Sequence, residues 1–215
     1  MKSISSLVFI LLLASCTHSP SVPSPEPPPG SPEPADAPTK LPEVCKTLSP
    51  IKRSCVWTPA HAAFVEARLT SVILGTDPQS LCPKYASLKE KKKFWSALFE
   101  ATSKFESGHW RLAKMTEAFV DSETRKLAVS AGLFQLSVGD VRRYKGPECQ
   151  KLNADTLFSQ EINAACAVEI FHALLAPLPP FKKVADTRAS LGRYWSTIRD
   201  RKVDGALKKG VPECY

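Results

Sequence analysis

The stretches FESG, residues 105–108, and SAGLFQLS, residues 130–137, decide the fold that the sequence predicts. The first places a carboxylic acid at the end of a helix expected over residues 86–106, and the second supplies a turn of small residues followed by an amide side chain. Gly108 suits the left-handed position just past a helix end. We therefore expect Glu106 in the last turn of this helix.

The expected helix has one apolar face. Its stripe is formed by Phe94, Leu98, Thr102 and Phe105, with Trp95 and Phe99 beside it, which is helical spacing. At the C-terminal end the helix dipole is negative and the surroundings are apolar, and both disfavour an ionised carboxylate. We expect Glu106 to hold a proton near neutral pH, as a general acid that cleaves a glycosidic bond must.

The N-terminal residues predict export. Residues 1–15 carry a positive charge followed by the apolar run Leu7 to Leu13, which is too short to span a bilayer. The stretch LASC that ends at Cys16 resembles the lipobox of bacterial lipoproteins, which implies a signal peptide over residues 1–15 and lipidation of Cys16. Because no Asp follows Cys16, the resemblance implies an outer-membrane anchor facing the periplasm. An ordinary secretory signal is the alternative, and it also exports the chain.

Six further cysteines agree with export, because disulfides persist in oxidising compartments. They are Cys45, Cys55, Cys82, Cys149, Cys166 and Cys214. An even six predicts three disulfides, with about fifteen connectivities open. The favoured pair is Cys149 with Cys166, which flank a compact turn and a helix start. No C-x-x-C pair or H-E-x-x-H motif is present, so neither a metal nor another cofactor is predicted.

The formal net charge of +8 fits solvated surface lysines, or attraction to an anionic polymer such as the peptide carboxylates of a cell wall. The basic cluster over residues 89–93 has no interleaved aromatic side chains. No nucleic-acid partner is therefore predicted.

Residues 16–42, the lipidated cysteine and a linker, contain ten prolines and little that is apolar. Such a segment cannot form a packed core and is expected to be extended. At about 3.1 Å per residue it could reach roughly 80 Å, which suits a tether between a lipid anchor and a target held off the membrane. A proline-rich ligand for a partner domain is the alternative.

Residues 43–85 are predicted to form a helical cap, pinned by disulfides, on a main domain over residues 86–215. Thr58 followed by Pro59 predicts a helix start, and an apolar face continues until Gly75 ends it. We assign no chemistry to this cap.

After Glu106 the sequence predicts a polar loop over residues 107–130 and then three helices. They are expected from Ser137 to about Arg143, from Ser159 onward, and over residues 186–199. Strand signals are weak throughout. The predicted fold is mainly α.

Four landmarks resemble the soluble lytic transglycosylases and their goose-type lysozyme relatives, over about residues 86–200. FESG at 105–108 is similar to the family's E-S motif, and AGLFQL at 131–136 is similar to its G-L-M-Q stretch. EINAACA at 161–167 is similar to a family segment around an asparagine that begins a core helix. RYW at 193–195 falls where the family has a tyrosine followed by asparagine. The resemblance implies a lysozyme-like fold.

The same resemblance implies roles for single residues. Glu106 would be the catalytic acid and base, Gln135 would line the sugar groove, and Tyr194 would help to position the glutamate. Ser107 is expected as a hydrogen-bonding neighbour at the substrate site, and Trp110, close to Glu106, as the best platform for a sugar ring. Structural roles remain open for Gln135, in its turn, and for Tyr194, in the core.

The chain departs from the family pattern at several points. Phe134 replaces a methionine, and Trp195 replaces the asparagine after the tyrosine, where a following glycine is also missing. The interval from Glu106 to Gln135 is longer than in compact members. These departures bear on substrate preference more than on the fold.

The favoured hypothesis is cleavage of the β-1,4 bond between N-acetylmuramic acid and N-acetylglucosamine in peptidoglycan glycan strands. Glu106 alone would protonate the bridging oxygen and then take a proton from the 6-hydroxyl of the muramic acid, which gives a 1,6-anhydro end without water. A hydrolytic lysozyme is the alternative, with Asp121 as second carboxylate and Glu117 and Glu123 in the same loop. A third hypothesis is an inactive peptidoglycan-binding lipoprotein.

Overall fold

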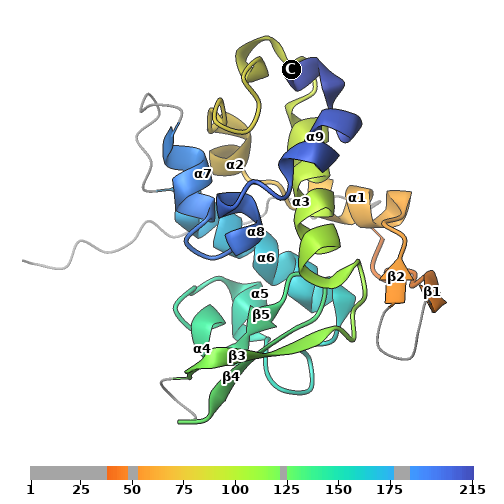
Figure 1. The fold of residues 1–215 in the computed structure, drawn as a ribbon, viewed down its shortest axis with the longest axis vertical. Helices are drawn as coiled ribbons and strands as arrows, with labels where there is room; N and C mark the ends of the chain where they lie inside the picture. The colour runs from red at the N-terminus through yellow and green to blue at the C-terminus, as the bar shows by residue number, and fades with distance from the viewer. Residues whose placement is uncertain (1–37, 48–52, 122–124, 177–184) are drawn as a thin grey trace, which may run out of the picture. The chain divides into compact units, whose positions relative to one another are not determined.

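The structure is a computed structural model that describes residues 38–47, 53–121, 125–176 and 185–215 (Figure 1). The longest element within these residues is the helix that carries Glu106 in its last turn. This helix, α3, spans Lys91–Ser107. It begins five residues later than predicted, because Tyr85–Ser87 forms a separate 3-10 turn, η1. It ends as predicted, with Gly108 in the left-handed conformation at φ 62°.

The predicted apolar stripe of α3 is buried except at its end. Phe94, Leu98 and Thr102 are fully buried, whereas Phe105 is 42% exposed. In the last turn Ser107, and not Phe105, faces the protein, because its hydroxyl donates to the carbonyl of Leu133 at 2.8 Å.

The segment before α3 is more broken than predicted. Strands β1 (Cys45–Thr47) and β2 (Arg53–Cys55) form a short antiparallel hairpin. The single helix expected from Pro59 to Gly75 is two helices, α1 (Pro59–Glu66) and α2 (Ser71–Gly75). The break is explained by Thr70, whose hydroxyl accepts a hydrogen bond from Ile73 N and so begins a new helix.

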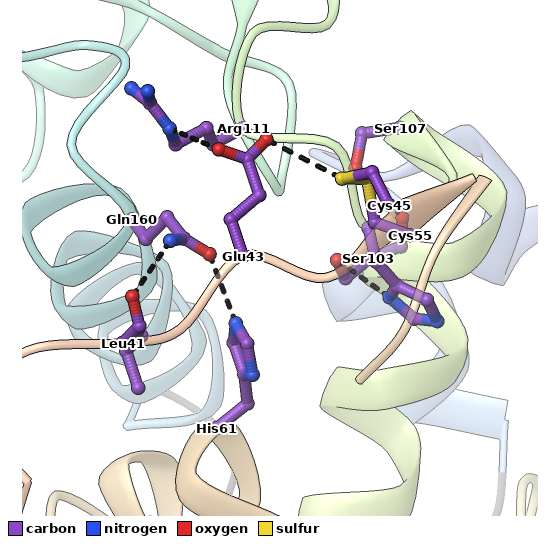
Figure 2. Close-up of a disulfide and its surroundings, with 10 residues drawn as sticks. Leu41, Glu43, Cys45, Cys55, His61, Ser103, Ser107, Arg111 and Gln160 are labelled. Atoms are coloured by element: carbon purple, nitrogen blue, oxygen red, sulfur yellow. Dashed lines mark hydrogen bonds and ion pairs between the residues drawn. A yellow bond between two sulfur atoms is a disulfide. The ribbon is translucent and has the colours of Figure 1, made fainter. Parts of the chain in front are cut away.

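The first described residues are held against the domain by polar contacts (Figure 2). Leu41 is buried, its N–H donates to Glu161 at 2.7 Å, and its carbonyl accepts from Gln160 at 3.0 Å. Gln160 also hydrogen-bonds to the buried His61, and Glu43 pairs with Arg111 at 2.6 Å. The folded part of the chain therefore includes Leu41, before the expected boundary at residue 43.

A small sheet replaces the loop that the sequence predicted over residues 107–130. Strands β3 (Lys114–Val120), β4 (Leu127–Ala131) and β5 (Leu136–Ser137) are antiparallel in the order β3-β4-β5. The prediction of a loop was wrong because β3 is an edge strand with exposed residues at six of its seven positions. No alternation of buried and exposed side chains marks such a strand.

The C-terminal half is helical. It contains α4 (Val138–Val141), α5 (Pro147–Gln150), α6 (Gln160–Leu175), α7 (Ala185–Leu191), α8 (Ser196–Arg199), α9 (Asp204–Gly210) and the 3-10 turn η2 (Pro212–Cys214). Ser159 caps α6 as predicted, accepting from Ile162 N. The helix expected from Ser137 to about Arg143 is only the four residues of α4, and the side chain of Ser137 does not cap it within the described structure.

The helix predicted over residues 186–199 is also two helices. The chain leaves α7 at Leu191 and becomes extended at Trp195 before α8 begins. The indole of Trp195 is 1% exposed and donates to the carbonyl of Phe134 at 3.1 Å. Burial of this one large side chain explains why the helix is interrupted.

One core joins these elements. Phe99 of α3 stacks on Phe171 of α6 with ring centroids 4.1 Å apart, and Phe171 contacts Trp195. The predicted number of three disulfides and the favoured pair Cys149–Cys166 are confirmed. The other two disulfides, whose pairing the sequence left open, are Cys45–Cys55 and Cys82–Cys214. None of the helices built from the described residues has the length and apolar character needed to cross a membrane. The predicted signal peptide, Cys16 and most of the linker lie outside these residues.

Candidate active site

A pocket of about 320 Å³ opens beside the C-terminal end of α3. The rest of its wall comes from β3, β4 and the turn that follows it, from α4 and the segment after it, and from α8 and the segment before it. Its lining consists of Glu106, Met115, Glu117, Phe119, Ser130, Gln135, Asp140, Arg143, Tyr144, Arg193, Tyr194, Trp195, Ser196 and Arg199. The pocket thus unites three of the residues that the sequence predicted for the site: Glu106, Gln135 and Tyr194.

Glu106 is half-buried and accepts a hydrogen bond from the hydroxyl of Thr197 at 2.6 Å. Burial raises the pKa of Glu106, and the nearby charge of Glu117 raises it further, while the Thr197 hydrogen bond and the charge of Lys202 act in the opposite direction. The expected rise in the pKa of this carboxyl is therefore confirmed in direction. A carboxyl group of this kind can hold a proton for a leaving group.

Glu117 is another carboxylate of the pocket lining, and its charge acts on Glu106. It lies on β3, and Ser130 of the paired strand β4 donates to its Oε1 at 2.5 Å. The alternation of Met115, Glu117 and Phe119 on one face of a strand brings all three side chains to the pocket. Because the residues of β3 are nearly all exposed, the sequence carried no alternation that would have placed Glu117 at the pocket.

Asp121, the favoured second carboxylate of the sequence analysis, does not line the pocket. It is 8% exposed, and its carboxylate packs directly against Gly139 in the first turn of α4, where a side chain on Gly139 would collide with it. This position at the start of a short helix indicates a structural role. Glu123 lies outside the described residues.

The turn at residues 132–135 has two residues in the left-handed conformation and is held by one buried polar side chain. Gly132 and Gln135 both have a positive φ, at 81° and 49°. The buried side chain of Asn163, on α6, donates to the carbonyls of Ala131 and Leu157 and accepts from Phe134 N. These bonds hold the whole turn, so Asn163 is a site-forming residue that acts through its neighbours.

Gln135 combines the two roles that the sequence left open. Its Nε2 donates to the carbonyls of Gly132 at 2.9 Å and Ala113 at 3.2 Å, which fixes the turn. The same side chain lines the pocket. The hydroxyl of Ser107 has two hydrogen-bond partners in the described structure, the carbonyls of Ser103 and Leu133, and Ser107 is not part of the lining.

Tyr194 lines the pocket and packs against Tyr144 and Trp195. Burial and the nearby charge of Asp140 raise the pKa of its hydroxyl, which lies close to the backbone of Ser137 without a hydrogen bond of good geometry within the described structure. Trp110, the expected sugar platform, is outside the lining. The exposed apolar side chains at the pocket are instead Met115 and Phe119, each 50% exposed.

Comparison with known proteins defines the class of fold. No protein-family profile matches the chain, and neither does any curated protein. Three solved structures do match, with TM-scores of 0.55 to 0.57 and 20 to 22% sequence identity, and the match covers 70% of this chain and 88% of theirs. The fold of the present chain is lysozyme-like.

The three similar structures are all of one protein, DslA, a lysozyme-like protein of a predatory bacterium. One is the wild-type protein, and each of the other two carries a single replacement of a glutamate by glutamine. At this level of identity the likeness establishes the fold.

Proposed function

We propose that the protein cleaves the β-1,4 bond between N-acetylmuramic acid and N-acetylglucosamine in peptidoglycan, with Glu106 as the general acid. The observation that carries the proposal is the pairing of Glu106, whose pKa is raised, with Glu117 in one pocket of a lysozyme-like fold. Phe119 and Met115 add apolar surface on which sugar rings can lie.

The solved neighbours add support for the glutamate pair. The two glutamates replaced in DslA are eleven positions apart in that protein. Glu106 and Glu117 are also eleven positions apart. Since glutamine keeps the shape of glutamate but cannot exchange a proton, such replacements are the usual way to test an acid or base.

The presence of Glu117 favours hydrolysis, the second of the enzymatic hypotheses from the sequence. Glu106 donates its proton to the bridging oxygen as the bond to the sugar carbon breaks, and Glu117 accepts a proton from the water molecule that attacks that carbon. Each step of this kind of proton transfer contributes typically about 10²–10⁴ to the rate. One product then carries a reducing end that contains the added water.

Lytic transglycosylation is the second candidate. One oxygen of Glu117 already accepts a hydrogen bond from the hydroxyl of Ser130, and transglycosylation does not need Glu117 to take a proton from water. In that reaction the 6-hydroxyl of the muramic acid replaces water and Glu106 serves as both acid and base. Glu117 would then support the electrostatics of Glu106 without contacting water. The two reactions differ in product mass by one water molecule.

The test is mass spectrometry of the fragments released from purified sacculi by the wild type, Glu106→Gln and Glu117→Gln. Hydrolysis predicts reducing-end fragments from the wild type and loss of most activity in both variants. Anhydro ends that persist in Glu117→Gln would establish the transglycosylase instead. Glu66→Gln, in the remote helix α1, is the matched control and should keep full activity. Binding to sacculi without any released fragments would favour an inactive binding protein.

A further inference from the structure

The pocket carries three arginines that the proposed reaction does not use. Arg143 follows α4, Arg193 lies between α7 and α8, and Arg199 ends α8, and all three line the pocket. We call this set the arginine rim. Its side chains are solvent-exposed, so they are accessible to a bound polymer.

The cation that lowers the pKa of Glu106 is Lys202, which is not part of the arginine rim. Arg143 and Arg193 instead act together on the hydroxyl of Tyr144, whose pKa is raised by burial and by Asp140 and lowered by both arginines. Two guanidinium groups therefore approach the same part of the pocket.

The arginines differ in their own partners. Arg143 is 3.8 Å from Asp140 and its side chain is 73% exposed, which leaves a weak, screened pair. Arg199 pairs with its neighbour Asp200 at 3.1 Å. Arg193 has no carboxylate partner among the described residues.

Arg193 is nevertheless held in place. It donates to the hydroxyl of Ser190 at 3.0 Å and contacts the carbonyl of the same residue. Ser190 is buried and donates in turn to the carbonyl of Leu174 on α6. A positioned guanidinium with donors left over is suited to bidentate binding of a carboxylate.

From these contacts we infer that the arginine rim binds carboxylate groups carried by the substrate, namely those of the peptides attached to the glycan strand. The inference rests on the proposed function and names the form of glycan that the site takes. The sugar rings themselves are neutral, whereas the attached peptides carry several carboxylates. The peptide is joined to the lactyl group of the muramic acid by an amide bond, so removing the peptide leaves a free lactyl carboxylate, which is the other source of the same chemistry.

The experiment measures binding, so that it does not depend on cleavage. Full-length protein in detergent, carrying Glu106→Gln, is titrated with soluble glycan strands that bear peptides and with the same strands after an amidase has removed them. Adding Arg143→Gln and Arg193→Gln is expected to weaken binding of peptide-bearing strands about tenfold, as for two exposed ion pairs. On stripped strands the same change should alter binding by less than about twofold.

A matched control carries Lys145→Gln, which removes one charge from an exposed residue outside the pocket. Its binding should stay within about twofold of the parent on both strands. Weakening of the arginine variant on stripped strands alone would assign the lactyl carboxylate, which is free only there, and overturn the peptide. Equal weakening on both strands would assign contacts to the sugars that both strands share, and would overturn the peptide as well. Unchanged binding on both strands would overturn the arginine rim altogether. Lack of cleavage by the wild type would refute the proposed reaction without affecting any of these comparisons.

Discussion

At the level of single residues, the burial of the Glu106 carboxyl lowers the stability of the folded protein when this group is ionised. Its pKa is raised by burial, so the folded state favours the neutral form. The stability from this preference is present below the ordinary pKa of 4.5 and is lost as pH rises through the folded pKa. At neutral pH, ionisation of Glu106 is therefore less favourable in the folded protein than in the unfolded chain.

Glu106→Gln should therefore abolish activity without lowering stability. Glutamine can still accept the Thr197 hydrogen bond through its carbonyl, and it removes the cost of a buried charge. We expect an unfolding temperature at pH 7 equal to or above that of the wild type, and a difference that shrinks toward pH 4. Scanning calorimetry at both pH values measures this. A clear loss of stability at pH 7 would mean that the ionised carboxylate is a structural partner.

His109 gives a second prediction, on acid stability. It is 8% exposed and hydrogen-bonds to Ser103, and burial with the charges of His61 and Lys104 lowers its pKa to about 4. Because the unfolded chain binds this proton near pH 6.5, stability should fall as pH drops from 6.5 to 4. The full loss from this residue would be about 3 kcal/mol.

The measurement is the free energy of unfolding in urea at pH 7 and pH 4.5, for the wild type and His109→Asn. Asn suits this position because the backbone is left-handed, at φ 60°. The variant should be less stable at pH 7 but less sensitive to acid. An equal loss in both proteins between the two pH values would assign the acid sensitivity to other groups.

At the level of elements, α3 and α6 could be predicted because each buries a continuous apolar stripe over four or more turns. Phe94 and Leu98 lie on the stripe predicted for α3, and both are fully buried. The broken helices could not be predicted in the same way, because their apolar spacing continues across breaks that Thr70 and Trp195 introduce. Helix prediction from sequence depends on the spacing of apolar residues, whereas these two breaks depend on the cap formed by Thr70 and on the packing of Trp195.

The candidate site shows the same division. Glu106 and the turn before Gln135 are local motifs and could be placed from sequence. Glu117 reaches the pocket only through the pairing of β3 with β4, a contact between separate segments. As long as residues 107–130 were taken for a loop, the sequence did not show which of their side chains face the pocket, and Asp121 was favoured over Glu117.

The turn between β4 and β5 provides the prediction at this level. Asn163 is fully buried and satisfies three backbone groups of the turn and its surroundings. Asn163→Ala should leave them without partners and cost about 3 kcal/mol of stability. Activity should fall as well, because Gln135 depends on the same turn.

Urea unfolding and turnover on sacculi, both measured well below the unfolding transition, check this. Asn153→Ala is the matched control, since Asn153 is exposed and makes only local turn contacts. A variant at Asn163 that stays as stable as this control would show that water or a shifted backbone replaces the three bonds.

At the level of the whole molecule, the question is how the folded domain reaches its substrate. Leu41 belongs to the domain, so the segment available as a linker is shorter than the 27 residues from Cys16 to Pro42. We propose that this segment joins the domain to a lipid on Cys16 in the outer membrane.

Cys16→Ala tests the anchor. The wild type should incorporate labelled palmitate and sediment with membranes, whereas the variant should lose the label. Purified forms of both should digest isolated sacculi at the same rate, because the pocket is built from residues far along the chain from the anchor. In cells the variant should show less wall lysis, because it lacks the lipid anchor that concentrates the wild type at the membrane. A wild-type protein without label would make the N-terminal stretch an ordinary secretory signal, and the proline-rich segment would then need another role, such as binding a partner domain.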